Sequence, residues 1–216
     1  FAGDSTFGSS NGFSAGSTYK LFTLIDWLEN GNSLNEVLNG RVHEVTRLQN
    51  SCVDGGWWID NSAEAINNFA RDPGRVGTPM QFTAASLNSG FLAMAEQLDL
   101  CDIQADATKM GVVNAKTGQP AEADNMGAFS VLGDLNVSPI SVAGAYATVA
   151  NGGVYCEPQA IDRVTDSDGN ELAVPERSCE RVLEESVAAT AAYALQGVMN
   201  GGTGAQGNPY DGIPVI

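Results

Sequence analysis

The chain has 216 residues, enough for one large domain or two small ones, and its 43% hydrophobic and 17% charged residues are typical of a globular protein. A net charge of −16, with only 10 Lys and Arg residues, leaves no basic surface to neutralise phosphates and therefore excludes nucleic-acid binding. No apolar run in the sequence is long enough to span a bilayer.

The first regular element is expected in residues 18–31, TYKLFTLIDWLENG. Apolar residues recur at positions 21, 24, 25 and 28, which is helical spacing, and aromatic residues at 22 and 27 cover most of the remaining circumference. Asn30-Gly31 is typical of a helix end. Because the helix is apolar nearly all round, we predict that it is buried.

Ser17 and Lys20, at the start of this helix, are the first candidates for chemistry. If Ser17 is the N-cap, Lys20 shares its face, and the Cβ atoms of such i,i+3 pairs lie about 5–6 Å apart. The helix dipole and burial should both lower the pKa of Lys20. A lysine that loses its proton readily can act as a general base towards a serine. The alternative is a chance match, since serine is a common N-cap.

Residues 32–77 are polar, rich in Asn and Gly, and without periodicity, which predicts an excursion of short elements. The chain has four cysteines but no CxxC pair, so zinc binding is not expected. Their order and spacing favour disulfides between Cys52 and Cys101 and between Cys156 and Cys179, although four cysteines allow three connectivities. Four buried free thiols are the alternative.

A second helical segment begins at Thr78-Pro79, a cap followed by a first helical position, and is interrupted at Ser86-Leu87-Asn88. If the interruption is a loop between two helices, Ser86 and Asn88 can face the same way. Ser86 can then relay a proton, and Asn88 can hold a peptide amide as both donor and acceptor. Serine and asparagine at helix junctions are more commonly caps, which is the alternative.

Three further elements follow. Ser138-Pro139 begins a helix that ends at Gly152-Gly153, residues 154–174 predict two strands around a turn at 168–170, and SVAATAAYALQGVMN predicts a last helix. The stretch DSDGN at 166–170 is similar to the start of a calcium-binding loop. Its glycine is at the wrong position, however, and Arg177 occupies the position of the final Glu ligand, so we predict a hairpin turn. Long helices with one or two hairpins indicate an α+β or α/β domain with a helical subdomain.

A Ser-His-Asp triad has little support in this sequence. The only histidine, His43, lies in a polar stretch, and no GxSxG elbow between a strand and a helix precedes it, because the GxSxG letters at 8–12 and 12–16 belong to an irregular stretch rich in Gly and Ser. We predict that His43 is a surface residue.

The Ser17-to-Lys20 and Ser86-to-Asn88 patterns, in this order, resemble the transpeptidase domain of penicillin-binding proteins, in particular the class A, bifunctional, high-molecular-mass kind. The resemblance covers most of the chain, while residues 32–77 and the first few residues fit it loosely. It rests on four longer stretches, GSTYKLFTLIDWLENG, FTAASLNSGFLAMAEQL, SPISVAGAYATVANGGVYCEP and CERVLEESVAATAAYALQGVMNGGTG.

The resemblance implies the α+β fold (α/β sandwich type) shared by penicillin-binding proteins and serine β-lactamases, with an antiparallel sheet flanked by helices and a helical subdomain. Residues 1–216 are expected to form one transpeptidase domain that is incomplete at both ends. The first strands of the sheet and the strand of the third motif, Lys-Thr-Gly, are expected outside the chain, the latter just beyond Ile216. The chain alone is therefore expected to be inactive or nearly so.

Lys116-Thr117-Gly118 has the same three residues as that third motif but lies in a different sequence context. It precedes the SPISVAGAYA stretch, and Pro120 and a polar run follow it. It is not a phosphate-binding loop either, because no glycine-rich turn precedes it at the required spacing. We predict a surface turn.

The activity that the resemblance implies is that of a peptidoglycan D,D-transpeptidase. Ser17 is expected to attack the D-Ala-D-Ala carbonyl of a stem peptide and Lys20 to take its proton. Ser86 is expected to pass a proton to the leaving amine and Asn88 to hold the peptide amide. An amine of a neighbouring stem then resolves the acyl-enzyme, and β-lactams acylate the same serine. The Ser17 N–H is expected to supply half of the oxyanion hole.

The expected partners are peptidoglycan stem peptides and β-lactam antibiotics, with no cofactor and no metal. An upstream glycosyltransferase domain, a membrane anchor and a place on the extracytoplasmic face of the bacterial membrane are expected from the resemblance. Three alternatives stay open: a D,D-carboxypeptidase or β-lactamase-type hydrolase, a β-lactam sensor without turnover, and a secreted structural domain in which Ser17 merely caps a helix.

Overall fold

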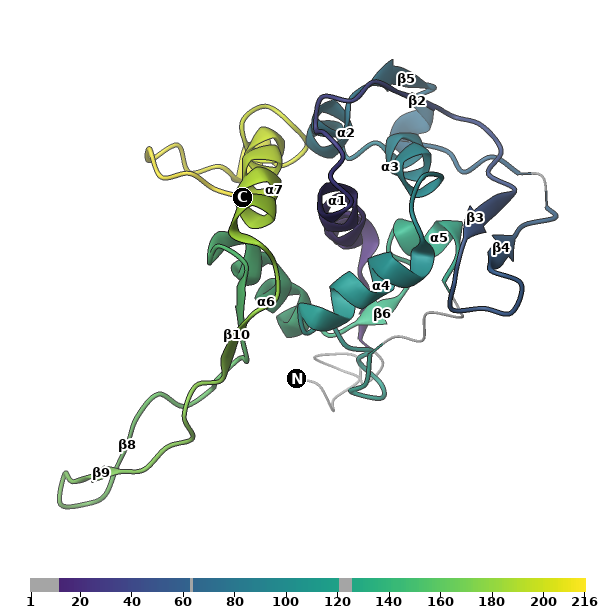
Figure 1. Cartoon of the computed structure of the whole chain (residues 1–216). Coiled ribbons are helices and arrows are strands. Elements are labelled where there is room, and N and C mark those ends of the chain that lie inside the picture. Colours follow the sequence, from purple (N-terminus) through teal and green to yellow (C-terminus); the bar gives the residue numbers. More distant parts are fainter. Residues whose placement is uncertain (1–11, 63, 121–125) are drawn as a thin grey trace.

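The computed structural model describes residues 12–62, 64–120 and 126–216. Helix α1 lies at its centre, and the other long helices surround it (Figure 1). The helices are α1 (Lys20–Glu29), α2 (Pro79–Ala85), α3 (Asn88–Ala95), α4 (Leu100–Lys109), α5 (Ala128–Val131), α6 (Pro139–Ala150) and α7 (Glu185–Met199), with 3-10 turns η1 (Gly16–Tyr19), η2 (Phe69–Arg71) and η4 (Ala205–Gly207).

Helix α1 is the buried helix that the sequence predicts. Every residue from Lys20 to Trp27 is buried, including the polar ones. The helix ends as expected, because Gly31 has a φ of 78° and the N–H groups of Gly31 and Asn32 donate to the carbonyls of Leu28 and Trp27. This left-handed glycine closes the last turn in a Schellman motif.

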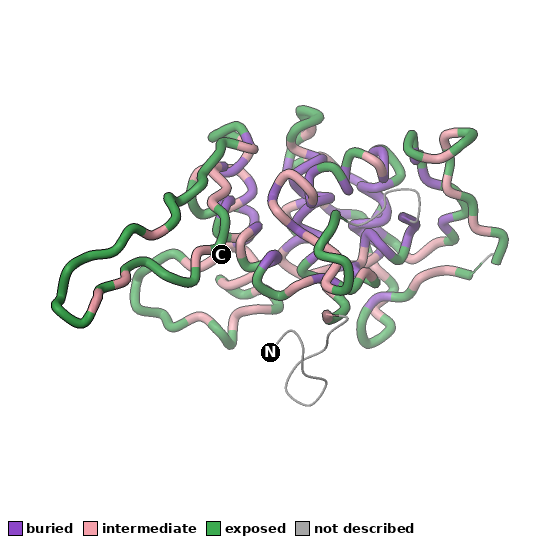
Figure 2. The backbone as a smooth tube through the Cα atoms, turned by 90° about the horizontal axis from the view of Figure 1, so that it is seen from below, coloured by how far each residue is buried: buried purple, intermediate pink, exposed green. Residues whose placement is uncertain are grey.

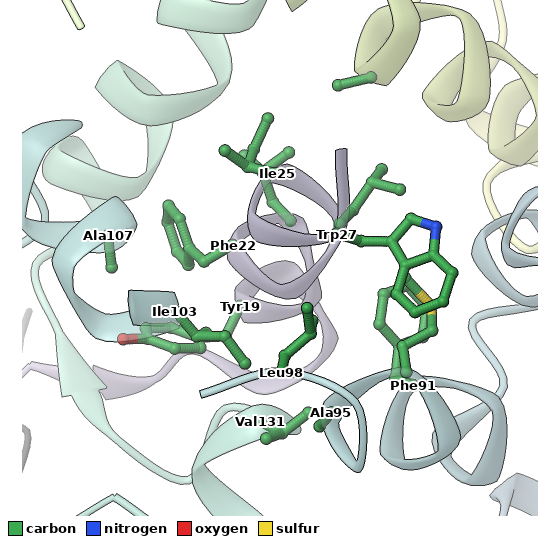
Figure 3. Close-up of a cluster of buried hydrophobic side chains, with 14 of the residues drawn as sticks. Tyr19, Phe22, Ile25, Trp27, Phe91, Ala95, Leu98, Ile103, Ala107 and Val131 are labelled. Carbon is green, nitrogen blue, oxygen red and sulfur yellow. The ribbon is translucent and has the colours of Figure 1, made fainter. Parts of the chain in front are cut away.

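The hydrophobic core forms around α1. Trp27 lies beside Phe91 of α3, and Phe22 faces the side of α4 that carries Ile103 (Figure 3). The side chains of Phe22 and Trp27 are completely buried. Burial of each such side chain contributes roughly 1.5–3 kcal/mol, so this packing fixes the helix that carries the candidate serine and lysine. The buried residues are concentrated in this central part of the molecule (Figure 2).

The predicted interruption at residues 86–88 separates α2 from α3. Thr78 caps α2 in a reciprocal capping box with Gln81, as the Thr-Pro pattern predicts. The chain then reverses at Ser86, whose φ of 48° and ψ of 40° are left-handed, and α3 starts at Asn88. The two helices pack closely because Gly90 has no side chain: a Cβ there would lie 2.3 Å from the Phe82 ring.

The strands of the described residues form five separate two-stranded antiparallel sheets, so the larger antiparallel sheet expected of the fold is not among them. The pairs are β1 (Phe13–Ser14) with β6 (Asn136–Val137), β2 (Leu38–Arg41) with β5 (Gly74–Gly77), β3 (Arg47–Gln49) with β4 (Trp57–Ile59), β7 (Val154–Cys156) with β10 (Cys179–Arg181), and β8 (Val164–Thr165) with β9 (Glu171–Leu172).

Residues 32–77 form the predicted excursion of short elements, β2 to β5. A disulfide between Cys52 and Cys101 ties this region to α4. The Asp99 carboxylate, at the start of α4, accepts a hydrogen bond from the N–H of Ser51. The expected pairing is confirmed, and it holds an aperiodic segment against the helical core.

Strands β7 to β10 form an extended arm that projects from the helices (Figure 1) and is mostly exposed (Figure 2). The second predicted disulfide, Cys156–Cys179, joins directly paired residues of β7 and β10 at its base. The N–H of Gly169 donates to the carbonyl of Asp166 at its tip, which confirms the hairpin turn in place of a calcium loop.

Lys116-Thr117-Gly118 is an exposed turn, as predicted. The Asn114 side-chain oxygen accepts from the N–H of Lys116, and the Asn114 carbonyl accepts from the N–H of Gly118.

None of the helices in the described ranges has the length and apolarity needed to cross a membrane.

Candidate active site

The amine of Lys20 lies where the two predicted motifs meet. Its Nζ is 3.2 Å from the Oγ of Ser17, 3.1 Å from the Oγ of Ser86 and 2.7 Å from the carbonyl oxygen of Ser86. It is also 2.7 Å from the Oδ1 of Asn88. All four residues predicted from the sequence therefore come together around one nitrogen.

The local geometry of Ser17 differs from the prediction in one respect. Ser17 is not the N-cap of an α-helix but the second residue of η1, and α1 begins only at Lys20. The 3-10 turn places side chains at i and i+3 almost in line, so the predicted approach of the lysine to the serine is retained. The Tyr146 hydroxyl, from α6, donates to the carbonyl of Thr18 (3.2 Å) and so supports this turn.

The left-handed backbone of Ser86 explains why its hydroxyl and its carbonyl both reach Lys20. A non-glycine residue in this conformation is disfavoured by roughly 1–2 kcal/mol. The reversal directs the side chain and the carbonyl to the same amine, which a continuous helix would not do. The break in helical periodicity is the sequence signal of this reversal.

Asn88 already has a partner within the chain for each end of its carboxamide. Its Oδ1 accepts from Lys20, and its Nδ2 donates to the carbonyl of Asn67 at 2.9 Å. One N–H and one lone pair stay free for a substrate amide. Asn88 can therefore still act as both donor and acceptor towards a substrate amide, as predicted, but only through this one N–H and this one lone pair.

Burial lowers the pKa of Lys20 to about 8, as the sequence predicts. Lys20 as a residue is only 4% exposed, and its Nζ lies 5.4 Å from the centre of the Phe91 ring. Near neutral pH a usable fraction of this amine is therefore unprotonated, which an exposed lysine does not offer.

Three of the four residues, Ser17, Lys20 and Ser86, line a cavity of about 290 Å³, whereas Asn88 lines another pocket together with Asn67. Ser17, Lys20 and Ser86 supply polar groups, and the rest of the wall is mainly apolar, with Tyr146 and Ile216 among the lining residues. A mainly apolar cavity with a few convergent polar groups is the usual form of a small-molecule site. Neither Phe91 nor Tyr146 was singled out from the sequence, because aromatic residues on helices are ordinarily core residues.

The other candidates are not part of this cluster. His43 bonds through its ring nitrogens to the Arg41 carbonyl and the Glu96 carboxylate, which raises its pKa. It is about one third exposed, which agrees with the predicted surface position. Among the residues that the structure describes, no group of three or more His, Cys, Asp or Glu side chains is placed to hold a metal ion.

Residues 7–215 match the sequence model of the family described as the penicillin binding protein transpeptidase domain. Penicillin-binding protein 2a of Streptococcus pneumoniae is 25% identical over 201 residues, which covers 72% of this chain and 27% of that protein. Penicillin-binding protein 1A of Mycolicibacterium smegmatis is 26% identical over 196 residues, which covers 86% of this chain and 23% of that protein. This chain thus spans about a quarter of the length of these relatives.

Solved structures share the fold. The imipenem acyl-enzyme complex of penicillin-binding protein A from Mycobacterium tuberculosis superposes with a TM-score of 0.73 at 19% identity, covering 94% of this chain and 47% of that one. The D,D-transpeptidase domain of a peptidoglycan glycosyltransferase from Eggerthella lenta gives a TM-score of 0.73 at 19% identity, covering 96% of this chain and 52% of that one. On the match of residues 7–215, the chain belongs to the penicillin-binding protein transpeptidase domain family.

Proposed function

We propose that this chain carries the nucleophile of a peptidoglycan D,D-transpeptidase, with Ser17 as the nucleophile and Lys20 as its general base. The observation that carries the proposal is the set of bonds around the Lys20 amine. Its two shortest contacts, at 2.7 Å, are to the Ser86 carbonyl and to the Asn88 Oδ1, which can only accept. A neutral amine has two N–H groups and one lone pair, so donating to these oxygens leaves the lone pair for a serine hydroxyl.

In the first half of the reaction, the Ser17 oxygen bonds to the carbonyl carbon of the penultimate D-Ala and its proton passes to Lys20. The C–N bond then breaks, and terminal D-Ala leaves as an amine that takes the proton from Lys20 through the Ser86 hydroxyl. This route is supported by the hydrogen-bond distance of both hydroxyls from the Lys20 nitrogen. The Ser17 N–H contributes to binding the oxyanion of the tetrahedral intermediate.

In the second half, the amine of a neighbouring stem peptide attacks the Ser17 ester. A new amide forms as the amine gives one proton to Lys20, the ester C–O bond breaks, and Lys20 returns the proton to the Ser17 oxygen, which restores the hydroxyl. β-Lactams acylate Ser17 in the same way, because opening of their ring leaves an ester on the serine. Asn88 holds the substrate amide with its free N–H and lone pair.

The proposal extends to the setting of the domain. Residues 1–216 form a single transpeptidase domain with an upstream glycosyltransferase domain and membrane anchor, at the extracytoplasmic face of a bacterial membrane. The two disulfides fit an oxidising compartment. A Lys-Thr-Gly strand beyond Ile216 completes the carboxylate-binding side of the cavity.

The test is intact-mass spectrometry after incubation with benzylpenicillin. It uses this chain and a form extended beyond Ile216 to include the third motif, each with Ser17→Ala as its control. We expect one adduct of the mass of the drug on the extended form, its absence in Ser17→Ala, and little or no adduct on residues 1–216 alone. A folded extended protein without an adduct would contradict the assignment of Ser17.

A further inference from the structure

A buried polar network lies directly behind the candidate site. The side chain of Asn68 donates from Nδ2 to the Ser89 Oγ (2.8 Å) and accepts at Oδ1 from the Ser89 N–H (2.9 Å). Both residues are almost inaccessible, at 6% and 1% exposed. Two bonds between the same two residues fix the relative position of the loop before β5 and the first turn of α3.

The network is anchored on both sides. The Asn68 Nδ2 also donates to the carbonyl of Asp72 (2.9 Å), and the Ser89 Oγ donates to the carbonyl of Gly40 in β2 (2.6 Å). The close packing leaves no room for adjustment, because a Cβ on Gly74 would lie 2.7 Å from the Ser89 Oγ. Buried networks in which every group has a partner are rigid.

The residues next to this pair carry the link to Lys20. Asn67 and Asn88 immediately precede Asn68 and Ser89, and the carbonyl of Asn67 accepts from the Nδ2 of Asn88. With Nδ2 held there, the opposite end of the carboxamide, Oδ1, faces the Lys20 amine. If Asn88 flipped, an N–H would face that amine in place of an oxygen.

We propose that Asn68 and Ser89 are positioning residues, which hold the Asn88 carboxamide in the orientation that presents its oxygen to Lys20. This inference rests on the proposed function only in that a change in the orientation of Asn88 is expected to alter acylation. The orientation itself is a property of the described residues. No atom of Asn68 or Ser89 needs to touch the substrate for either to affect acylation.

The chain provides a matched pair of variants for the test. Asn68→Ala removes the buried side chain, whereas Asn67→Ala removes the same group from the preceding, exposed residue, which holds Asn88 through its backbone only. Ser89→Ala removes the hydroxyl of the pair and is the milder second variant if Asn68→Ala does not fold. The sequence has only three lysines, at 20, 109 and 116, so ¹³C-lysine NMR can follow each amine, with Lys20→Arg for assignment.

We expect Asn68→Ala to lower the pKa of Lys20 by about one further unit, since the ammonium loses a charge-assisted acceptor. Asn67→Ala should leave that pKa unchanged, and Ser89→Ala should give a smaller change of the same sign. In the form extended beyond Ile216, the rate constant for acylation by benzylpenicillin should fall roughly tenfold or more in Asn68→Ala, because a small displacement of a catalytic group has effects of this size.

Equal Lys20 titration and acylation in Asn68→Ala and Asn67→Ala, with only a loss of stability in the first, would overturn the proposal. Failure of the proposed function gives a different result. The wild-type extended form would then show no adduct, while the Lys20 pKa would still respond to Asn68→Ala and not to Asn67→Ala.

Discussion

The Nζ of Lys20 lies 3.1 Å from the Oγ of Ser86, although 66 positions separate the two residues along the chain. The contact joins the buried central helix to the reversal between α2 and α3. It forms because Lys20 begins α1 directly after η1, and the left-handed backbone of Ser86 brings its hydroxyl to the Lys20 amine. Ser86 is therefore on the proton path that we propose.

Acylation should depend on pH through the Lys20 amine. Its folded-state pKa is about 8, below the ordinary value, because burial disfavours the ammonium. The base is the neutral form, so the acylation rate constant should rise about tenfold per pH unit below pH 8 and level off above it. Rates of benzylpenicillin adduct formation, measured by mass spectrometry on the extended form from pH 5.5 to 9.5, give this profile.

Lys20→Arg is the control for the pH profile. Arginine retains the charge but does not deprotonate in this range, so its residual rate should lack the inflection near pH 8. An inflection that persists in Lys20→Arg would assign the titration to another group.

Ser86→Ala and Ser86→Gly separate the hydroxyl of Ser86 from its backbone. Both remove the Oγ that bonds to Lys20, so both should slow acylation by a similar factor, of the order of 10²-fold. Only glycine adopts the left-handed conformation without strain, so Ser86→Gly should be about 1 kcal/mol more stable than Ser86→Ala. Urea unfolding and acylation rates test the two effects. If the acylation rates of the two variants instead follow their stabilities, the loss of the hydroxyl does not explain the slower acylation.

Local pattern was sufficient to predict the elements of this site, but not their arrangement. The helical spacing of residues 18–31 and the break at residues 86–88 each follow from local sequence, and the structure has both. The approach of Lys20 to Ser86 depends on how two helices pack, and single-sequence periodicity does not contain that information. Resemblance to a known family supplied it.

The sequence does not reveal that Asn67 and Asn68 hold Asn88 in place, and the reason is physical. Asn67 and Asn68 lie in a polar, aperiodic stretch, where asparagine is an ordinary turn residue. Only burial distinguishes Asn68, which bonds to Ser89, from Asn67, which is an exposed residue. The disulfides were easier to predict, because four cysteines allow few pairings.

The two disulfides should differ in their effect on the site. Cys52–Cys101 ties the segment that contains Asn67 and Asn68 to α4, whereas Cys156–Cys179 closes the projecting arm. Replacing both cysteines of the first by serine should lower the free energy of unfolding by about 2–4 kcal/mol and slow acylation. The same change in the second should leave acylation unaffected. Equal acylation rates in the two double variants would contradict a role for the tethered segment.

Asp26, in the middle of α1, should destabilise the protein when it is ionised. It is 3% exposed, and its Oδ2 has no hydrogen-bond partner among the described residues, while its Oδ1 accepts from Asn30. Burial raises its pKa to about 7, with nearby carboxylates adding to the effect. Between pH 3.8 and 7 the folded state retains a proton that the unfolded state releases, so stability falls as the pH rises through this range.

Asp26→Asn removes this charge and retains an oxygen for Asn30. The free energy of unfolding should therefore increase by about 1–2 kcal/mol at pH 8, less than the full pKa shift because the new amide N–H groups are buried. The gain should be small at pH 4, where the carboxyl is protonated in the folded state and, just above its ordinary pKa of 3.8, only about half ionised in the unfolded state. Urea unfolding at the two pH values measures the difference, with the exposed Asp54→Asn as the control for net charge. A gain that is the same at pH 4 and pH 8 would show that packing, and not ionisation of Asp26, is responsible.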